Sequence, residues 1–268
     1  MAGNHKVIAA GMTALVTGAS SGIGEQFARQ LADRGVHLVL VARSRQRLED
    51  VAADLRRRYR DLTVGVQAAD LAEADGADQL ADTLVRSDVT VDLLINAAGV
   101  GSHDLFVNQD PGAITQQIQL NCVSLVALTR QFVPGMVTRR RGGVINVAST
   151  AGFQPVPTMA TYAASKAFVL SFTEALWAET EGAGVRVMTL CPGPTETRFF
   201  EAAAPGEQFL TRGRQSAEHV AAVALRYFDR SHQPTLVPGA ANRLLASGYR
   251  LMPRGVMAHM AERTVRSG

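Results

Sequence analysis

Lysine is almost missing from this sequence. Lys6 and Lys166 are the only lysines among 27 basic residues, so arginine supplies nearly all the other positive charge. Arginine occupies almost every other basic position. A lysine inside a patterned segment is therefore not expected to be an ordinary surface cation. We therefore single out Lys166 as a candidate functional residue.

Cysteines and long apolar runs are also scarce. Cys122 and Cys191 are the only cysteines, and they form no CxxC pair or Cys/His cluster, so neither a disulfide framework nor a metal site is supported. We therefore expect a reducing, cytoplasmic compartment. No run reaches the roughly 18 apolar residues that span a bilayer. Lys6 and the stretch 7–16 mimic a signal peptide, but the stretch continues into a glycine-rich turn and is expected to be a retained strand.

The excess of positive charge is small. The formal net charge is +3 at pH 7, and much of the arginine is clustered in the triplets 56–58 and 139–141. Each triplet ends a helix-like segment, where the helix dipole stabilises cations. This favours a structural role for the triplets over the alternative, a nucleic-acid patch.

Apolar, β-branched runs alternate with helical patterns along most of the 268 residues. Such alternation predicts βαβ crossovers, and strands that are almost entirely apolar predict burial on both faces. We therefore expect an α/β fold, with a single doubly wound, Rossmann-type parallel sheet and helices on both faces, over residues 1–240. The expected strands lie near residues 12–17, 36–42, 62–67, 91–96, 143–148, 185–190 and 234–237, and the expected helices near 22–34, 44–60, 74–86, 112–140, 160–182 and 216–229.

The first predicted strand leads into a glycine-rich turn that opens a helix. The turn has the pattern Gly18-x-x-x-Gly22-x-Gly24. Glycines let the backbone approach a pyrophosphate closely, and the amides of the helix N-terminus can then bind it. A purely structural glycine turn is the alternative. The residues expected to bind a cofactor here are Gly18, Ser20, Ser21, Gly22, Ile23 and Gly24.

The end of the second predicted strand indicates which cofactor binds. An acidic residue there would hydrogen-bond the ribose 2′-hydroxyl of NAD, but the sequence has Arg43 followed by Ser44. An arginine can hold a 2′-phosphate by charge-assisted hydrogen bonds. This favours NADP(H), with Arg45 or Arg47 assisting. The alternative is that Arg43 is only a solvated residue at a helix start.

Ser149, Tyr162 and Lys166 form a second candidate constellation. Four residues along a helix advance about 6 Å and about 400°, so Tyr162 and Lys166 project from nearly the same face. A tyrosine with the ordinary pKa of about 10 is a poor base at neutral pH, and a neighbouring ammonium lowers that pKa. Ser149, at the end of a predicted strand, can hydrogen-bond a substrate oxygen opposite the phenol. The pattern predicts acid–base chemistry by Tyr162.

Together with the phosphate turn, these residues resemble the short-chain dehydrogenase/reductase family. The resemblance covers roughly residues 8–240 and also rests on Asn96-Ala97-Ala98-Gly99 and on the segment 192–197. The catalytic roles that it implies are general acid/base for Tyr162, polarisation of the carbonyl for Ser149, ribose binding and a lowered phenol pKa for Lys166, and support of a proton-relay water for Asn121.

The resemblance also implies further cofactor contacts. Asp70 and Leu71 would flank the adenine, and Asn96 would support the sheet and the cofactor. The family's Asn-Asn-Ala-Gly pattern has Ala97 as its second residue here, a departure at a position that usually plays a structural part. The remaining expected cofactor contacts are those of Tyr162 and Lys166 with the ribose and those of Pro192, Gly193, Thr195 and Thr197 with the carboxamide or pyrophosphate.

The likeness is narrower in two segments. Residues 191–199 and 41–44 are similar to a subgroup of ketoacyl-type and hydroxysteroid-type reductases, which implies a bulky, apolar carbonyl substrate. The irregular segment 193–215, which carries Phe199, Phe200 and Phe209, is expected to close over that substrate. Residues 241–268 are expected to form an extension packed on the same domain; lining the pocket, covering a neighbouring subunit, contacting a membrane surface and ordinary packing all stay open for it.

The sequence therefore predicts an oxidoreductase that transfers a hydride between NADP(H) and a secondary alcohol or ketone. We expect a small-molecule substrate, no nucleic-acid partner and no integral membrane segment. The family resemblance implies a homodimer or homotetramer built on the helices 112–140 and 160–182. Two alternatives belong to other classes. One is a dinucleotide-binding module without catalysis, and the other is epimerisation or dehydration on the same scaffold.

Overall fold

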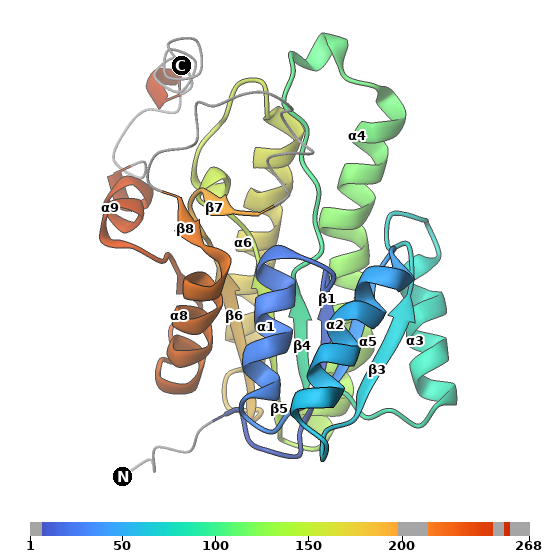
Figure 1. Cartoon of the computed structure of the whole chain (residues 1–268). Coiled ribbons are helices and arrows are strands. Elements are labelled where there is room, and N and C mark those ends of the chain that lie inside the picture. Colours follow the sequence, from blue (N-terminus) through green and yellow to red (C-terminus); the bar gives the residue numbers. More distant parts are fainter. Residues whose placement is uncertain (1–6, 198–213, 249–254, 258–268) are drawn as a thin grey trace.

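A single parallel sheet organises the chain (Figure 1). The computed structural model describes residues 7–197, 214–248 and 255–257. In these ranges seven strands pair in the order β3-β2-β1-β4-β5-β6-β9, all in parallel. The strands are β1 (Thr13–Thr17), β2 (His37–Ala42), β3 (Val64–Ala68), β4 (Leu93–Asn96), β5 (Gly142–Val147), β6 (Val185–Leu190) and β9 (Thr235–Leu236). This confirms the doubly wound fold that the alternating pattern predicted.

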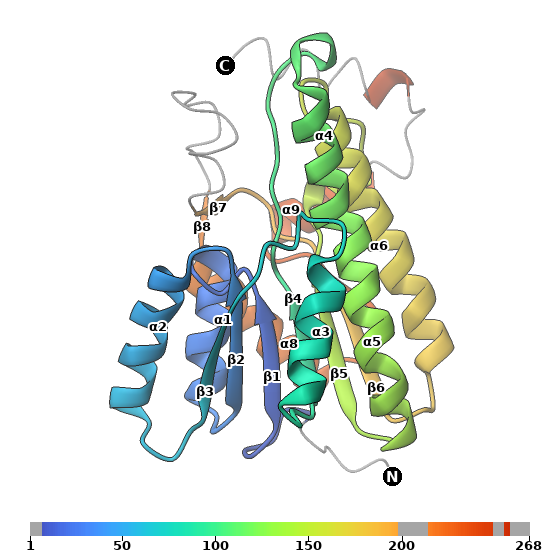
Figure 2. The same ribbon diagram turned by 90° about the vertical axis from the view of Figure 1, so that its right-hand side faces the viewer.

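Helices cover both faces of the sheet (Figure 2). Parallel strands need crossover connections, and right-handed crossovers place successive helices on opposite faces when the strand order reverses. One face carries α1 (Gly22–Ala32), α2 (Arg45–Arg58) and α8 (Ala217–Arg230), and the other carries α3 (Gly76–Arg86), α5 (Ser124–Thr138) and α6 (Ala160–Thr180).

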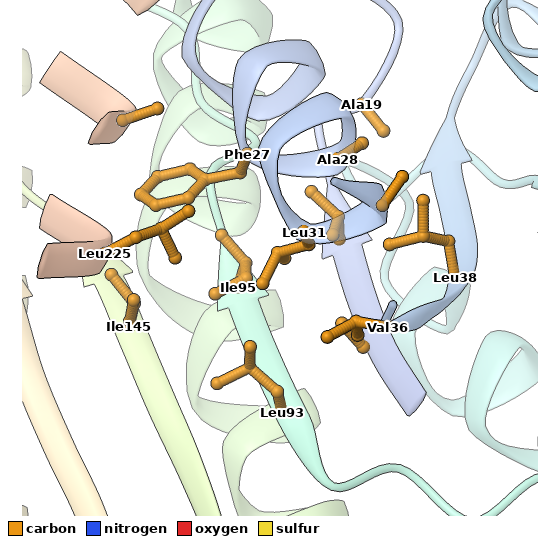
Figure 3. Packing of buried hydrophobic residues seen from close by; sticks show 14 of the residues in the cluster. Ala19, Phe27, Ala28, Leu31, Val36, Leu38, Leu93, Ile95, Ile145 and Leu225 are labelled. Atoms are coloured by element: carbon orange, nitrogen blue, oxygen red, sulfur yellow. The ribbon is translucent and has the colours of Figure 1, made fainter. Parts of the chain in front are cut away.

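The core under α1 shows why the strands are so apolar (Figure 3). Phe27 and Leu31 on α1 are fully buried and point at Ile95 on β4 and Ile145 on β5, with Leu225 of α8 beside them. Each buried side chain of this size contributes about 1.5–3 kcal/mol relative to an exposed one. Because both faces of the sheet are covered in this way, strand residues on either face avoid water.

The sequence predicts one regular helix over residues 112–140, but the structure has three consecutive helical segments there. They are α4 (Pro111–Ile118), a π-helical segment η2 (Gln119–Val123) and α5. A π turn holds one extra residue, which rotates the helix face locally and is common at functional sites. Asn121 lies in the middle of this segment and is fully buried.

The same helical region is the one described segment long and apolar enough, by length and composition, to cross a membrane. It runs over Pro111–Thr138, and 44% of its most apolar window is buried inside the chain. It packs against α3 and β5 in the core. Core helices commonly have this composition, so the finding is weak evidence for a membrane span.

Several short elements at the carboxyl edge of the sheet escaped the sequence pattern. Two-residue strands and single helical turns are too short to produce a periodicity, and the helix Ala240–Gly248 has only nine residues. Two segments discussed above lie largely outside the described residues. They are the extension 241–268 and the segment with Phe199, Phe200 and Phe209, which was expected to close over the substrate. The short elements are η1 (Phe106–Asn108), η3 (Thr150–Phe153), β7 (Thr195–Glu196), β8 (Gln215–Ser216) and α9 (Ala240–Gly248).

Candidate functional site

The candidate site lies at the carboxyl edge of the sheet, where the strand order reverses between β1 and β4. Thr17 pairs with Asn96 across β1 and β4, and Asn96 pairs with Asn146 across β4 and β5. Ligands of open parallel sheets bind beyond this edge at the reversal. Thr17 also accepts hydrogen bonds from the backbone N–H groups of Ala97 and Ala98, both at 3.0 Å, which fixes the end of β4 beside the phosphate turn.

The phosphate turn is packed so tightly that side chains are excluded from it. A Cβ at Gly24 would lie 2.7 Å from the carbonyl carbon of Gly18, and one at Gly22 would lie 2.9 Å from Thr197 Cγ2. Gly22 also has a φ of 58°, in the left-handed region that favours glycine. Thus the fold brings Thr197, far along the chain, against the turn.

The N-terminus of α1 is open to an anion. Within the described part of the chain, Ser21 is the N-cap and its side chain makes no capping hydrogen bond. The first backbone N–H groups of a helix have no intrahelical partner and carry partial positive charge. The backbone cradle and these donors therefore fit a dinucleotide pyrophosphate.

Arg43 extends from the end of β2 next to this turn. The backbone N–H of Ala19 donates to Val41 O at 3.2 Å, which ties the turn to β2 two residues before Arg43. Arg43 is exposed, and Ser44 caps α2 by accepting from the Arg47 backbone N–H at 3.4 Å. The guanidinium is thus available to an anionic group bound beside the turn.

Asp70 and Leu71 follow the end of β3, on the same edge. Asp70 Oδ1 accepts from the Ala72 backbone N–H at 2.9 Å, and Leu71 O accepts from Ser124 Oγ at 2.6 Å. The pair is therefore fixed in place from β3 and from the start of α5, while its contact with an adenine stays a prediction.

Tyr162 and Ser149 meet in a buried place between η3 and α6. Tyr162 is 9% exposed, and its hydroxyl is within hydrogen-bonding reach of the Ser149 side chain. Ser149 leaves β5 and caps η3 by accepting from the Ala151 backbone N–H at 3.1 Å. Burial raises the pKa of the Tyr162 phenol to about 12, and the hydrogen bond with Ser149 offsets only part of this effect.

The raised pKa differs from the sequence expectation that Lys166 lowers it. The Lys166 ammonium donates to Val147 O at 2.9 Å, and it lies 5.8 Å from the centre of the Tyr162 ring. Desolvation is the largest cause of the Tyr162 shift, and it favours the neutral phenol. The Tyr162 phenol is therefore protonated at neutral pH.

Lys166 is buried too, with 5% of its surface exposed. Burial lowers the pKa of its amine to about 8, against the opposing effects of Cys122 and Cys191. Gly99 lies close to it, since a Cβ there would be 3.3 Å from Lys166 Nζ and 3.2 Å from Asn121 Oδ1. Lys166 thus belongs to one compact polar cluster with Asn121.

The π-helical segment aims Asn121 into this cluster. Asn121 Oδ1 accepts from the Val100 backbone N–H at 3.0 Å, and its Nδ2 donates to Val100 O at 2.9 Å and to Ser165 Oγ at 3.0 Å. Ser165 Oγ donates in turn to Tyr162 O at 2.7 Å. Ser165 is not among the residues predicted from the sequence, although its place one helical turn after Tyr162 could have indicated it.

The turn that follows β6 lies at the same edge of the sheet. Thr150 N–H donates to Pro192 O at 2.9 Å, and Thr195 Oγ1 donates to Gly193 O at 2.9 Å. These bonds place the turn beside η3 and therefore beside Ser149. The structure thus brings all the residues expected at the site to one edge, while their individual roles stay predictions. The described residues contain no group of three or more His, Cys, Asp or Glu side chains that could hold a metal ion.

Sequence comparison connects this arrangement with known proteins. Residues 12–208 match the sequence model for short chain dehydrogenase. A very-long-chain 3-oxoacyl-CoA reductase from Phaeosphaeria nodorum is 37% identical over 181 residues, which are 66% of this chain and 53% of that protein. A very-long-chain 3-oxoacyl-CoA reductase-A from Danio rerio is 30% identical over 94% of this chain and 80% of its own. The chain spans about half the length of the fungal relative.

Solved structures show the same likeness over most of the chain. A short-chain dehydrogenase from Sphingobium yanoikuyae, in complex with NADPH, has a TM-score of 0.80 and 34% identity, over 90% of this chain and 94% of that one. A bulky-bulky ketone specific alcohol dehydrogenase from Comamonas testosteroni has a TM-score of 0.76 and 30% identity, over 90% and 92%.

Proposed function

Because the chain belongs to the short chain dehydrogenase family, an oxidoreductase family, we propose that it transfers a hydride between NADP(H) and a secondary alcohol or ketone. The observation that supports this most is the buried cluster of Ser149, Tyr162 and Lys166 beside an open phosphate turn. The nicotinamide, when bound, supplies or accepts the hydride.

In the proposed reaction the chain handles the substrate oxygen and its proton. The Ser149 hydroxyl and the Tyr162 phenol both hydrogen-bond the carbonyl oxygen, which polarises the carbonyl. Tyr162, neutral because burial raises its pKa to about 12, gives its proton to the oxygen as the ketone is reduced. Lys166 holds positive charge next to the phenol and stabilises the phenolate that this transfer leaves.

Arg43 supports NADP(H) rather than NAD(H) as the cofactor. It is exposed beside the phosphate turn, where a carboxylate would repel a 2′-phosphate and a guanidinium attracts one. A related protein of 34% identity carries NADPH in its structure. Both points favour the phosphorylated dinucleotide.

We also propose a bulky, apolar substrate. The chain resembles reductases of very-long-chain 3-oxoacyl-CoA and a dehydrogenase specific for ketones with two bulky groups. An apolar strip, Leu105 to Val107, is exposed on the loop that follows β4. The Asp104 backbone N–H donates to Thr158 O at 2.9 Å, which ties this strip to the segment that leads into α6 and Tyr162.

Assembly and location are further proposals. Val123 of η2 and Phe168 of α6 are 48% and 45% exposed, so both could bury apolar surface in a homodimer or homotetramer. Leu170 of the same helix α6 is 9% exposed and packs inside the chain, so it adds little to such a surface. The cytoplasmic location stays a prediction from cysteine usage.

The central experiment follows NADPH oxidation with a panel of ketones graded in size and polarity. We expect turnover to favour bulky, apolar ketones, and Tyr162→Phe to lower kcat by at least about 100-fold while NADPH affinity stays nearly unchanged. Conversion of a substrate without net NADPH oxidation would indicate epimerisation or dehydration instead. NADPH binding without turnover of any carbonyl compound would favour a binding module.

A further inference from the structure

Helix α9 lies directly against the turn that follows β6 (Figure 1). It begins at Ala240, four residues after β9, and its Ala246 is 6% exposed. Ala246 shares an apolar cluster with Cys191, the residue that starts the turn, and with Val169 of α6. The helix also contacts η3, the segment that follows Ser149. Thus α9 rests on two segments of the candidate site at once.

Asn242, in the first turn of α9, makes the closest approach. A Cβ added to Gly193 would lie 2.8 Å from both Cγ and Oδ1 of Asn242, and closer still to its Nδ2. Real Cβ atoms are essentially never this near to other heavy atoms, so the Asn242 carboxamide occupies the space that any side chain at position 193 would need. A side chain at position 193 would therefore have to displace the Asn242 carboxamide from its place.

The carboxamide itself is held in place. Asn242 Nδ2 donates to Pro238 O at 2.9 Å, so it is bound to the segment between β9 and α9. Side chains fixed by packing and by a hydrogen bond can hold a neighbouring loop in one geometry. Asn242 therefore has the rigidity that a support for the turn requires.

Backbone hydrogen bonds support the turn on either side of Gly193. Pro192 O accepts from the Thr150 backbone N–H at 2.9 Å, and Pro194 O accepts from the Gln215 backbone N–H at 3.0 Å. These bonds fix the residues before and after Gly193 to η3 and β8. Between them, the Asn242 carboxamide fills the space that a Cβ at Gly193 would take.

We propose that Asn242 is a positioning residue, whose carboxamide fixes the Gly193 turn in the geometry that receives the nicotinamide end of the dinucleotide. This inference rests on the proposed function for the identity of the ligand. It extends the site to α9, beyond the segment that carries the sequence motifs. Asn242 acts through Gly193 and does not itself contact the reacting atoms.

The test is a double-mutant cycle with dinucleotide affinity as its readout. The variants are Gly193→Ala, Asn242→Ala and their combination, each titrated with NADPH and with NADH. We expect Gly193→Ala to weaken NADPH binding by about tenfold or more, and Asn242→Ala to weaken it severalfold. The double variant should bind at least about fivefold more tightly than the product of the two single effects predicts, because the new methyl group then has room.

Two matched variants show whether space is the cause. Asn242→Leu keeps a branched side chain of similar size and adds no charge, so Gly193→Ala should stay impaired in that background. Ser247→Ala removes a polar group from an exposed position of the same helix and should leave the affinity unchanged. The thermal unfolding midpoint is measured for every variant, since a purely structural role would lower it and leave the affinity of the folded protein intact.

The outcomes separate the inference from the proposed function. If the wild-type chain binds dinucleotide and the two substitutions act independently, the inference is wrong and the proposed function stands. If the wild-type chain binds neither dinucleotide, both are wrong. A Gly193→Ala protein that folds only when position 242 is alanine supports the coupling, and one that folds in neither background contradicts it.

Discussion

The two halves of the sheet are held together in different ways. In the nucleotide half, formed by β1 to β3 with α1 and α2, the interior is apolar and the charged groups pair at the surface. In the reaction half, formed by β4 to β6 with α5 and α6, polar side chains lie in the interior. Among the described residues, Thr17 is the only buried polar side chain before Asp92, and the rest lie between Asp92 and Thr195.

Each half has the kind of interaction that its proposed task requires. A phosphate turn is made from backbone and glycine, which local packing can hold. Acid–base groups must be oriented inside the protein, away from water, and buried polar groups need partners with fixed geometry. In the reaction half Asn96 Nδ2 donates to Asn146 Oδ1 at 2.9 Å, and Asn146 Nδ2 donates to Thr173 Oγ1 at 2.9 Å, linking β4, β5 and α6 under the site.

The largest expected effect is that of Lys166→Arg. The guanidinium keeps the charge but is a wide planar fork, and the site holds a compact ammonium between Val147 O and Gly99. We expect kcat to fall by at least about 100-fold, with the protein still folded. Near-normal turnover would show that the position needs only a positive charge.

The wild-type pH profile sharpens this prediction. Burial lowers the Lys166 pKa to about 8, so the ammonium is present below that pH and is lost above it. Tyr162 keeps its proton to about pH 12. We therefore expect kcat/KM for ketone reduction in the wild-type chain to fall as the pH rises through about 8, and the residual activity of Lys166→Arg to lack this step. A wild-type profile that is flat from pH 6 to 10 would contradict the assignment.

The second effect is on stability and concerns Asn146→Ala. Asn146 is fully buried, and its loss would leave Asn96 Nδ2 with one partner fewer and open a small cavity. We expect the free energy of unfolding to fall by about 2–3 kcal/mol, measured by urea titration. Asn108→Ala is the matched control, because Asn108 is exposed and makes one hydrogen bond to Asp104 Oδ1 at 3.2 Å. Equal losses for the two variants would show that the buried amide network does not stabilise the reaction half.

The same contrast explains what the sequence could and could not predict. The phosphate turn, Arg43 and the Tyr162–Lys166 spacing are local patterns, and local backbone geometry was enough to place them. Ser149 was found because it ends a strand that parallel pairing brings to the same edge. Each of these predictions depends on a single helix or strand, or on two that are adjacent.

The missed features depend on contacts between distant parts of the chain. Asn242 meets Gly193 only because β9 pairs with β6, and no periodicity records that contact. The π turn at Asn121 departs from the helical repeat by a single residue, and the sequence pattern of a regular helix hides it. The pKa of Tyr162 depends on burial, which outweighs the nearby charge that the sequence reveals.

A smaller effect is expected in the nucleotide half for Arg43→Ala. Loss of one charge-assisted contact to the 2′-phosphate should weaken NADPH binding by roughly tenfold, about 1.4 kcal/mol, and leave NADH binding nearly unchanged. Arg60→Ala removes the same charge from an exposed position beyond the end of α2 and serves as the control. Equal loss for both dinucleotides would show that Arg43 does not distinguish them.

The smallest effect is expected for the surface ion pairs that distinguish the nucleotide half. Arg57 Nη2 lies 2.5 Å from Asp54 Oδ1, but the Arg57 side chain is 80% exposed, so water and salt screen the pair. Asp54 also pairs with Arg29, since Arg29 Nη1 lies 2.6 Å from Asp54 Oδ2. This hydrogen bond is the main cause of the lowered pKa of Asp54.

Arg57→Ala should therefore shift the thermal unfolding midpoint by no more than about 2 °C at neutral pH. Because the Asp54 pKa is lowered, its pairing stabilises the chain above the ordinary pKa of a carboxyl and is lost as the pH falls through the lowered value. Arg57→Ala should leave that acid-side loss in place, and Arg29→Ala should reduce it. A large shift for Arg57→Ala would mean that surface pairing supports the nucleotide half as strongly as buried polar contacts support the reaction half.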